Sequence, residues 1–152
     1  IPFRTAIMGE MWIVRDLAEA MVRTCHTGEH PAHTKAILET GALEDAPVIR
    51  RAAECVVEAG VDFIKTSTGK VPVGATPEAV STMFEVVVEH YRATSRLVGV
   101  KVSGGVRTTA DAAQYLGIAE QALSPLGIAP GPANVRIGAS SLYDDLARAL
   151  EA

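Results

Sequence analysis

The sequence predicts an α/β protein built around a parallel sheet, and two observations lead to this class. Short apolar runs of three to five residues alternate with amphipathic helical segments, which is typical of parallel strands joined by crossover helices. Each apolar run is followed by a polar stretch that contains glycine. In parallel α/β folds the chemistry gathers at the C-terminal ends of the strands, so these stretches are the first candidates for a functional site.

The elements are expected to be one helix followed by four strand–helix units. The first helix covers residues 10–24, where apolar side chains recur at helical spacing. Strands are expected over residues 35–39, 61–65, 97–101 and 135–137, and helices over 46–59, 76–91, 108–123 and 140–150. Thr76 has the side chain of an N-cap, and Pro77 suits the first helical position. No linker interrupts the pattern, so residues 1–152 are predicted to form one domain.

Composition excludes several classes of function. The 152 residues are 48% hydrophobic and 21% charged, as in an ordinary globular domain. The net charge of −4 and the lack of any basic run argue against a nucleic-acid partner. No apolar run approaches the roughly 18 residues of a membrane span, and no signal peptide is visible, so no membrane partner is expected. Two unpatterned cysteines suit a reducing cytosol, which predicts a cytoplasmic protein.

Two predicted strands end in a lysine, Lys65 and Lys101. Neighbouring parallel strands lie about 4.8 Å apart, so the two side chains are expected to face each other if their strands are neighbours. A second cation and partial burial lower the pKa of a lysine and leave the neutral amine that a Schiff base requires. The alternative is that each lysine extends its ammonium to solvent from a strand end, which fits either lysine better when it is taken alone.

The last two strand ends suggest an anion site. Gly104 and Gly105 allow the backbone to approach a ligand closely. The stretch from Gly138 through Ser140 and Ser141 runs directly into a helix, whose free N–H groups favour an anion. The alternatives are a plain glycine turn and an ordinary N-cap at Ser140.

Three histidines, His26, His30 and His33, lie in the stretch CHTGEHPAH. Their spacing raises the question of a metal site. The stretch contains Gly and Pro and follows a helix, so the simpler interpretation is a solvated loop, and no metal is expected.

Three segments, GVDFIKTSTGK, VGVKVSGGVRTTADAAQYL and RIGASSLYDDL, closely resemble deoxyribose-phosphate aldolases, and IPFR and KAILETGAL extend the resemblance over nearly the whole chain. The resemblance implies a (β/α)8 TIM barrel, of which this chain would supply about four C-terminal βα units, with the N-terminal strands missing. It also implies a class I aldolase that needs no cofactor. Such an enzyme reversibly cleaves 2-deoxy-D-ribose 5-phosphate to acetaldehyde and D-glyceraldehyde 3-phosphate, a step of deoxyribonucleotide catabolism.

The resemblance also implies roles for individual residues. Lys65 matches the Schiff-base lysine and Lys101 the second active-site lysine. The residues that match the binding of the substrate phosphate and hydroxyls are Thr68, Gly69, Lys70, Gly104, Gly105, Ser140 and Ser141, with Gly138 supporting the last turn. The family's proton-relay carboxylate would lie before Ile1, and Glu39 is interpreted as a polar rim residue instead.

The expected partners are a phosphorylated sugar and either further copies of the chain or a complementing N-terminal half. Two other functions remain open at this point. One is a half-barrel that binds phosphorylated sugars without catalysis, and the other is a half-barrel interaction module.

Overall fold

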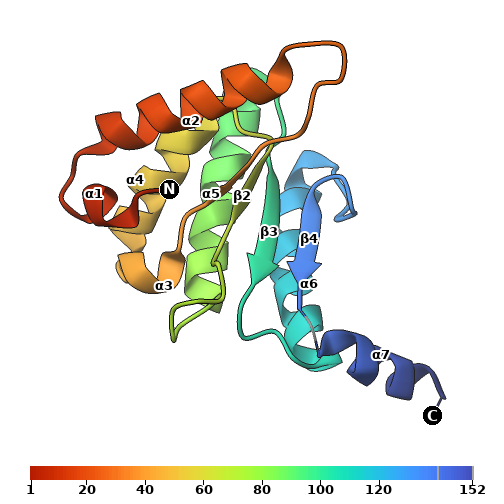
Figure 1. Cartoon of the computed structure of the whole chain (residues 1–152). Helices are drawn as coiled ribbons and strands as arrows, with labels where there is room; N and C mark the ends of the chain where they lie inside the picture. Colours follow the sequence, from red (N-terminus) through yellow and green to blue (C-terminus); the bar gives the residue numbers. More distant parts are fainter. Residues whose placement is uncertain (140, 152) are drawn as a thin grey trace.

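The computed structural model describes residues 1–139 and 141–151, which form a four-stranded parallel sheet backed by helices (Figure 1). The strands are β1 (Lys35–Ile37), β2 (Phe63–Lys65), β3 (Gly99–Ser103) and β4 (Val135–Gly138), and they are ordered β1-β2-β3-β4. The helices are α1 (Phe3–Ile7), α2 (Met11–His26), α3 (Thr40–Leu43), α4 (Ala46–Glu58), α5 (Pro77–Thr94), α6 (Thr109–Leu123) and α7 (Leu142–Glu151), with a 3₁₀ turn, η1, at Ser124–Leu126. The predicted order of strands and crossover helices is confirmed.

Local sequence explains where the longer crossover helices begin. The Thr76 hydroxyl accepts a hydrogen bond from the Ala79 N–H at 3.2 Å, and Pro77 occupies the first turn of α5. Thr108 and Asp111 form a capping box at the start of α6. These caps fix where each helix leaves the preceding loop, and those loops lie at the C-terminal edge of the sheet.

The two faces of the sheet carry different side chains because strand residues alternate in direction. Ala36, Ile64, Val100 and Val102 are buried against the helices, and Figure 1 shows α4, α5 and α6 lying along this face. The opposite face carries the alternate residues, which include three half-buried lysines and one arginine: Lys35, Lys65, Lys101 and Arg136. The apolar core therefore lies on the outer, helix-covered side, and the chemically reactive groups lie on the inner side.

Several predicted boundaries were wrong. Strand β3 runs to Ser103, which pairs with Gly138 of β4, so Lys101 is the middle residue of β3 and not its last. The short helices α1 and α3 were not predicted, since neither is long enough to show helical periodicity. None of the helices in the described ranges is long and apolar enough to cross a membrane.

Candidate active site

Lys65 and Lys101 are direct neighbours across the sheet. Their Cα atoms are register partners in the parallel pairing of β2 with β3. Both side chains lie on the inner face, because Ile64 and Val100 beside them are buried on the outer one. Burial lowers the pKa of Lys65, and the positive charge of Lys101 lowers it further, while the carboxylate of Glu39 acts in the opposite direction. The arrangement favours a neutral, nucleophilic amine at Lys65.

The loop after β2 is held by its own hydroxyl groups. The Thr66 hydroxyl donates to the Ser103 carbonyl at 2.8 Å and accepts from the Ser103 N–H at 2.9 Å. Ser67 and Ser103 exchange two further bonds, each from a hydroxyl to the other residue's carbonyl, at 2.7 and 2.9 Å. Thr66 and Ser67 are fully buried, so their hydroxyls shape the turn after Lys65 and do not face a ligand.

The loop after β3 presents bare backbone. Gly104 and Gly105 both have positive φ angles, +86° and +84°, which glycine adopts without strain. A side chain on Gly104 would collide with the Ser67 hydroxyl, whereas none of the described residues lies within 4 Å of the place where a Gly105 side chain would begin. Gly105 therefore exposes its backbone to the open space in front of the sheet.

Gly138 has a different reason to lack a side chain. A Cβ atom there would lie 2.7 Å from Cε and 3.4 Å from Nζ of Lys101. The absence of a side chain lets the Lys101 ammonium group lie against the end of β4. The structure thus gives Gly138 a role next to the second lysine, in addition to the predicted support of the turn.

These strand ends line one cavity of about 330 Å³. Eight of the ten predicted site residues line it: Lys65, Thr68, Gly69, Lys101, Gly104, Gly105, Gly138 and Ser141. Lys70 lies on the same loop with an exposed side chain that is not among the lining residues. Ser140, which the sequence also placed at the anion site, lies outside the described residues.

Four lining residues were not predicted: Ser103, Val106, Ala139 and Arg107. Arg107 is the most informative, because it adds a permanent cation beside the glycine turn. The run Gly-Gly-Val-Arg in the sequence carried this signal, since it places an arginine two residues after the turn.

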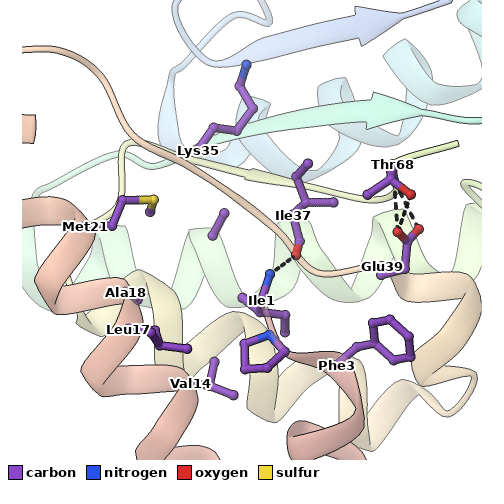
Figure 2. A pocket seen from close by; sticks show the side chains of 12 residues that line it. Ile1, Phe3, Val14, Leu17, Ala18, Met21, Lys35, Ile37, Glu39 and Thr68 are labelled. Carbon is purple, nitrogen blue, oxygen red and sulfur yellow. Dashed lines mark hydrogen bonds between the residues drawn. The ribbon is translucent and has the colours of Figure 1, made fainter. Parts of the chain in front are cut away.

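A second, larger cavity of about 570 Å³ lies beside the first, between α2 and β1 (Figure 2). Its wall is mostly apolar and includes Val14, Leu17 and Ile37. The amino group of Ile1 donates to the Ile37 carbonyl at 2.8 Å, so the start of the chain lies along the outer edge of β1. Thr68 lines both cavities, and at this point they share a wall.

The histidine-rich stretch lies at the opposite end of the strands. His26 is the last residue of α2, not a loop residue as predicted, and its Nε2 lies 2.7 Å from a carboxylate oxygen of Asp62. The same carboxylate accepts hydrogen bonds from the N–H and hydroxyl of Thr34 at 2.7 and 3.0 Å. Within residues 1–139 and 141–151 no cluster of three or more His, Cys, Asp or Glu side chains could hold a metal ion. These contacts fasten the loop before β1.

A parallel sheet with crossover helices on its outer face, and with polar, glycine-containing loops at the C-terminal ends of its strands, is the architecture of α/β barrel proteins. A family model described as DeoC/LacD family aldolase matches residues 15–146. The protein belongs to the DeoC/LacD aldolase family.

Solved structures agree on the fold. An apo structure described as a deoxyribose-phosphate aldolase of Toxoplasma gondii ME49 superposes with a TM-score of 0.83 at 24% identity, over 99% of this chain and 57% of the other. The corresponding protein of Coccidioides immitis gives a TM-score of 0.76 at 26% identity, over 99% and 50%. The tetrameric deoxyribose phosphate aldolase of Aeropyrum pernix gives 0.62 at 23%, over 91% and 49%.

The chain thus spans between 49% and 57% of the length of these three proteins. The fold is that of the TIM-barrel aldolases, and the described residues supply four neighbouring strands of such a barrel. These strands carry both lysines and both glycine turns of the candidate active site.

Proposed function

We propose that this protein takes part in the class I aldol reaction that interconverts 2-deoxy-D-ribose 5-phosphate with acetaldehyde and D-glyceraldehyde 3-phosphate. The observation that carries the proposal is Lys65 paired in register with Lys101 inside a cavity that the glycines after β3 and at the end of β4 also line. Membership of the aldolase family and the neighbour at 26% identity support it.

In the direction of synthesis, the neutral amine of Lys65 attacks the carbonyl carbon of acetaldehyde and water leaves, which gives an imine. Loss of a proton from the methyl carbon converts the imine to an enamine, because the protonated nitrogen accepts the electron pair. The enamine carbon forms a bond to the aldehyde carbon of glyceraldehyde 3-phosphate, while the aldehyde oxygen takes the electron pair of the broken π bond and a proton and becomes a hydroxyl group. Water then hydrolyses the resulting imine, which releases 2-deoxy-D-ribose 5-phosphate and the free amine of Lys65. Burial and the positive charge of Lys101 on the neighbouring strand both lower the pKa of Lys65, which favours the free amine that this step requires.

The phosphate of the substrate is proposed to bind where the loops after β3 and β4 meet. The exposed backbone at Gly105, the guanidinium of Arg107 and the hydroxyl of Ser141 all line this part of the cavity. Backbone N–H groups and an arginine are strong partners for phosphate oxygens. Thr68, Gly69 and Lys70 on the facing loop, together with Ser140, complete the proposed set.

The test is covalent trapping. Incubation of the protein with acetaldehyde and borohydride should leave a two-carbon adduct on Lys65, and mass spectrometry of peptides should locate it. The variant Lys65→Ala should lose the adduct, while Lys35→Met, which removes another lysine of the same sheet face, should keep it. An adduct that forms reproducibly on Lys70 or Lys35 instead would overturn the assignment. Phosphate binding without any adduct would favour the non-catalytic sugar-phosphate half-barrel.

A further inference from the structure

Glu39 is a buried carboxylate that the proposed chemistry does not use. It lies two residues after β1, and only 5% of its surface is exposed. Its backbone adopts the left-handed conformation, with φ of 62° and ψ of 56°, which is costly for a residue with a side chain. Glu39 thus lies at the strand end where the sequence interpretation as a polar rim residue placed it, but its side chain is buried. A buried charge on a strained backbone indicates that the surrounding structure holds this side chain in place.

All the hydrogen bonds that the structure gives to the Glu39 carboxylate come from Thr68, as Figure 2 shows. The Thr68 N–H lies 3.1 and 3.2 Å from the two carboxylate oxygens, and the Thr68 hydroxyl donates to one of them. Hydrogen bonds to an ionised acceptor are stronger than neutral ones. The two residues are 29 positions apart, so this contact joins the loop after β1 to the loop after β2.

The contact continues into the proposed substrate loop. The Thr68 hydroxyl oxygen, while it donates to Glu39, accepts the N–H of Lys70 at 3.1 Å. Gly69 between them has a positive φ of +81°, and none of the described residues lies within 4 Å of the place where its side chain would begin. The path of residues 68–70 past the cavity therefore depends on the Glu39–Thr68 contact on one side and on the Thr66 and Ser67 hydrogen bonds on the other.

We propose that Glu39 is a positioning residue of this site, which holds Thr68, Gly69 and Lys70 in the conformation that receives the phosphorylated half of the substrate. This inference rests on the proposed function. Glu39 acts through Thr68 and does not touch the reacting atoms. Removal of its carboxylate should therefore weaken binding of the phosphorylated substrate. It should not prevent the reaction of Lys65 with acetaldehyde, which has no phosphate.

The charge of Glu39 gives a second, independent readout. The charged side chains near Lys65 are Lys35 and Glu39 from β1 and the segment after it, Lys101 from β3 and Arg136 from β4. Glu39 alone among them raises the pKa of Lys65. Loss of this charge lowers that pKa further, so the neutral amine appears at lower pH. Adduct formation with acetaldehyde should then begin at a lower pH than in the unmodified protein.

The experiment compares Glu39→Gln with Glu44→Gln, a matched control in which an exposed glutamate of the same segment loses its charge. The kcat and KM are measured with 2-deoxyribose 5-phosphate and with 2-deoxyribose, and borohydride trapping is followed against pH. For Glu39→Gln we expect kcat/KM to fall about tenfold or more with the phosphorylated sugar, mainly through KM, and much less with the unphosphorylated one. The trapping profile should move to lower pH, and Glu44→Gln should behave as the unmodified protein does.

Thr68→Val and Thr68→Ser test the same contact from its other side. Thr68→Val removes the hydroxyl, keeps the shape and should reproduce the loss with the phosphorylated sugar, whereas Thr68→Ser should restore binding. The positioning role would be overturned if kcat/KM fell equally with both sugars in Glu39→Gln and in Thr68→Val. It would also be overturned if kcat/KM did not fall in either variant. If Glu39→Gln fails to fold, Thr68→Val decides alone. Absence of any adduct in the unmodified protein would instead contradict the proposed function.

Discussion

The loops that follow β2 and β3 meet at one cavity but are built in opposite ways. After β2, three consecutive residues with hydroxyl groups, Thr66, Ser67 and Thr68, use those groups to bond other parts of the chain. After β3, the turn consists of Gly104 and Gly105, and the space in front of Gly105 is open. One loop is fixed to the rest of the chain by its side-chain hydrogen bonds, and the other offers its backbone because its two glycines have no side chains.

The difference shows how a small site can be both fixed and open. The hydroxyl groups of the TST stretch after β2 form hydrogen bonds within the chain. Gly104 and Gly105, which have no side chains, line the cavity. A hydroxyl group in a sequence motif is therefore weak support for ligand binding until its hydrogen bonds are known. Variants that remove a hydroxyl group from the first loop, or add a side chain to the second, test this difference.

The largest effect is expected from Gly104→Ala. The new methyl group must adopt a positive φ and would begin 2.5 Å from the Ser67 hydroxyl oxygen and 2.9 Å from the Cα of Gly74. Backbone strain and overpacking together should lower the free energy of unfolding by about 3 kcal/mol or more. Urea unfolding followed by circular dichroism measures this value.

Gly105→Ala is the matched control for this prediction. Gly105 has a similar positive φ, and no residue in the described part of the chain lies within 4 Å of its added methyl group, so this variant should lower the free energy of unfolding by about 1 kcal/mol from backbone strain alone. Equal destabilisation by the two variants would show that the loops after β2 and β3 do not pack as tightly as the structure indicates.

A smaller loss of stability is expected from Thr66→Val. The valine keeps the shape of threonine, but the buried N–H of Ser103 loses its hydrogen bond to the Thr66 hydroxyl, and the Ser103 carbonyl keeps only its bond from the Ser67 hydroxyl. An unsatisfied buried donor costs about 1–3 kcal/mol, so unfolding should become easier by about 2 kcal/mol. The same unfolding experiment measures it. An unchanged free energy of unfolding would mean that the hydroxyl of Thr66 does not hold the loop after β2 in place.

Much of the fold was predictable from local patterns. The signals for the fold are local in the sequence: they are the alternation of strands and helices, Thr76 before Pro77 and the glycines at the strand ends. The structure confirms the order of strands and helices that they predicted. The pairing of Lys65 with Lys101 was also expected, because each was predicted to be the last residue of its strand and the two strands are consecutive in the sequence. Neither prediction required knowledge of contacts across the sheet beyond strand adjacency.

The features that escaped prediction depend on contacts between distant residues. Glu39 was interpreted as a rim residue because nothing near it in the sequence reveals that Thr68, 29 positions away, bonds its carboxylate. The extra residues of β3 result from pairing with β4, and the length of a strand pair is not a property of either strand alone. The need for glycine at position 138 likewise follows from the side chain of Lys101 on the neighbouring strand.

Gly138→Ala should affect the chemistry more than the stability. Its backbone is not in the left-handed region, and the atoms that a methyl group would displace most are the flexible end of Lys101. The free energy of unfolding should change by less than about 1 kcal/mol. Trapping with acetaldehyde should become slower at neutral pH, because Lys101 moves away and the pKa of Lys65 rises toward its ordinary value. An unchanged trapping profile would separate Gly138 from the lysine pair.

The smallest effects are expected from the two exposed cations, Arg107 after β3 and Lys70 after β2. Arg107 lines the cavity beside the open glycine turn, whereas the side chain of Lys70 does not line it. Arg107→Met should raise the KM for the phosphorylated sugar about threefold to tenfold at low salt, and Lys70→Met less than about twofold, because exposed charges interact weakly through water. Both differences should shrink at high ionic strength, and the KM for unphosphorylated deoxyribose should stay constant in both variants. A larger effect for Lys70 would mean that the loop after β2, and not the glycine turn after β3, supplies the cation that binds the phosphate.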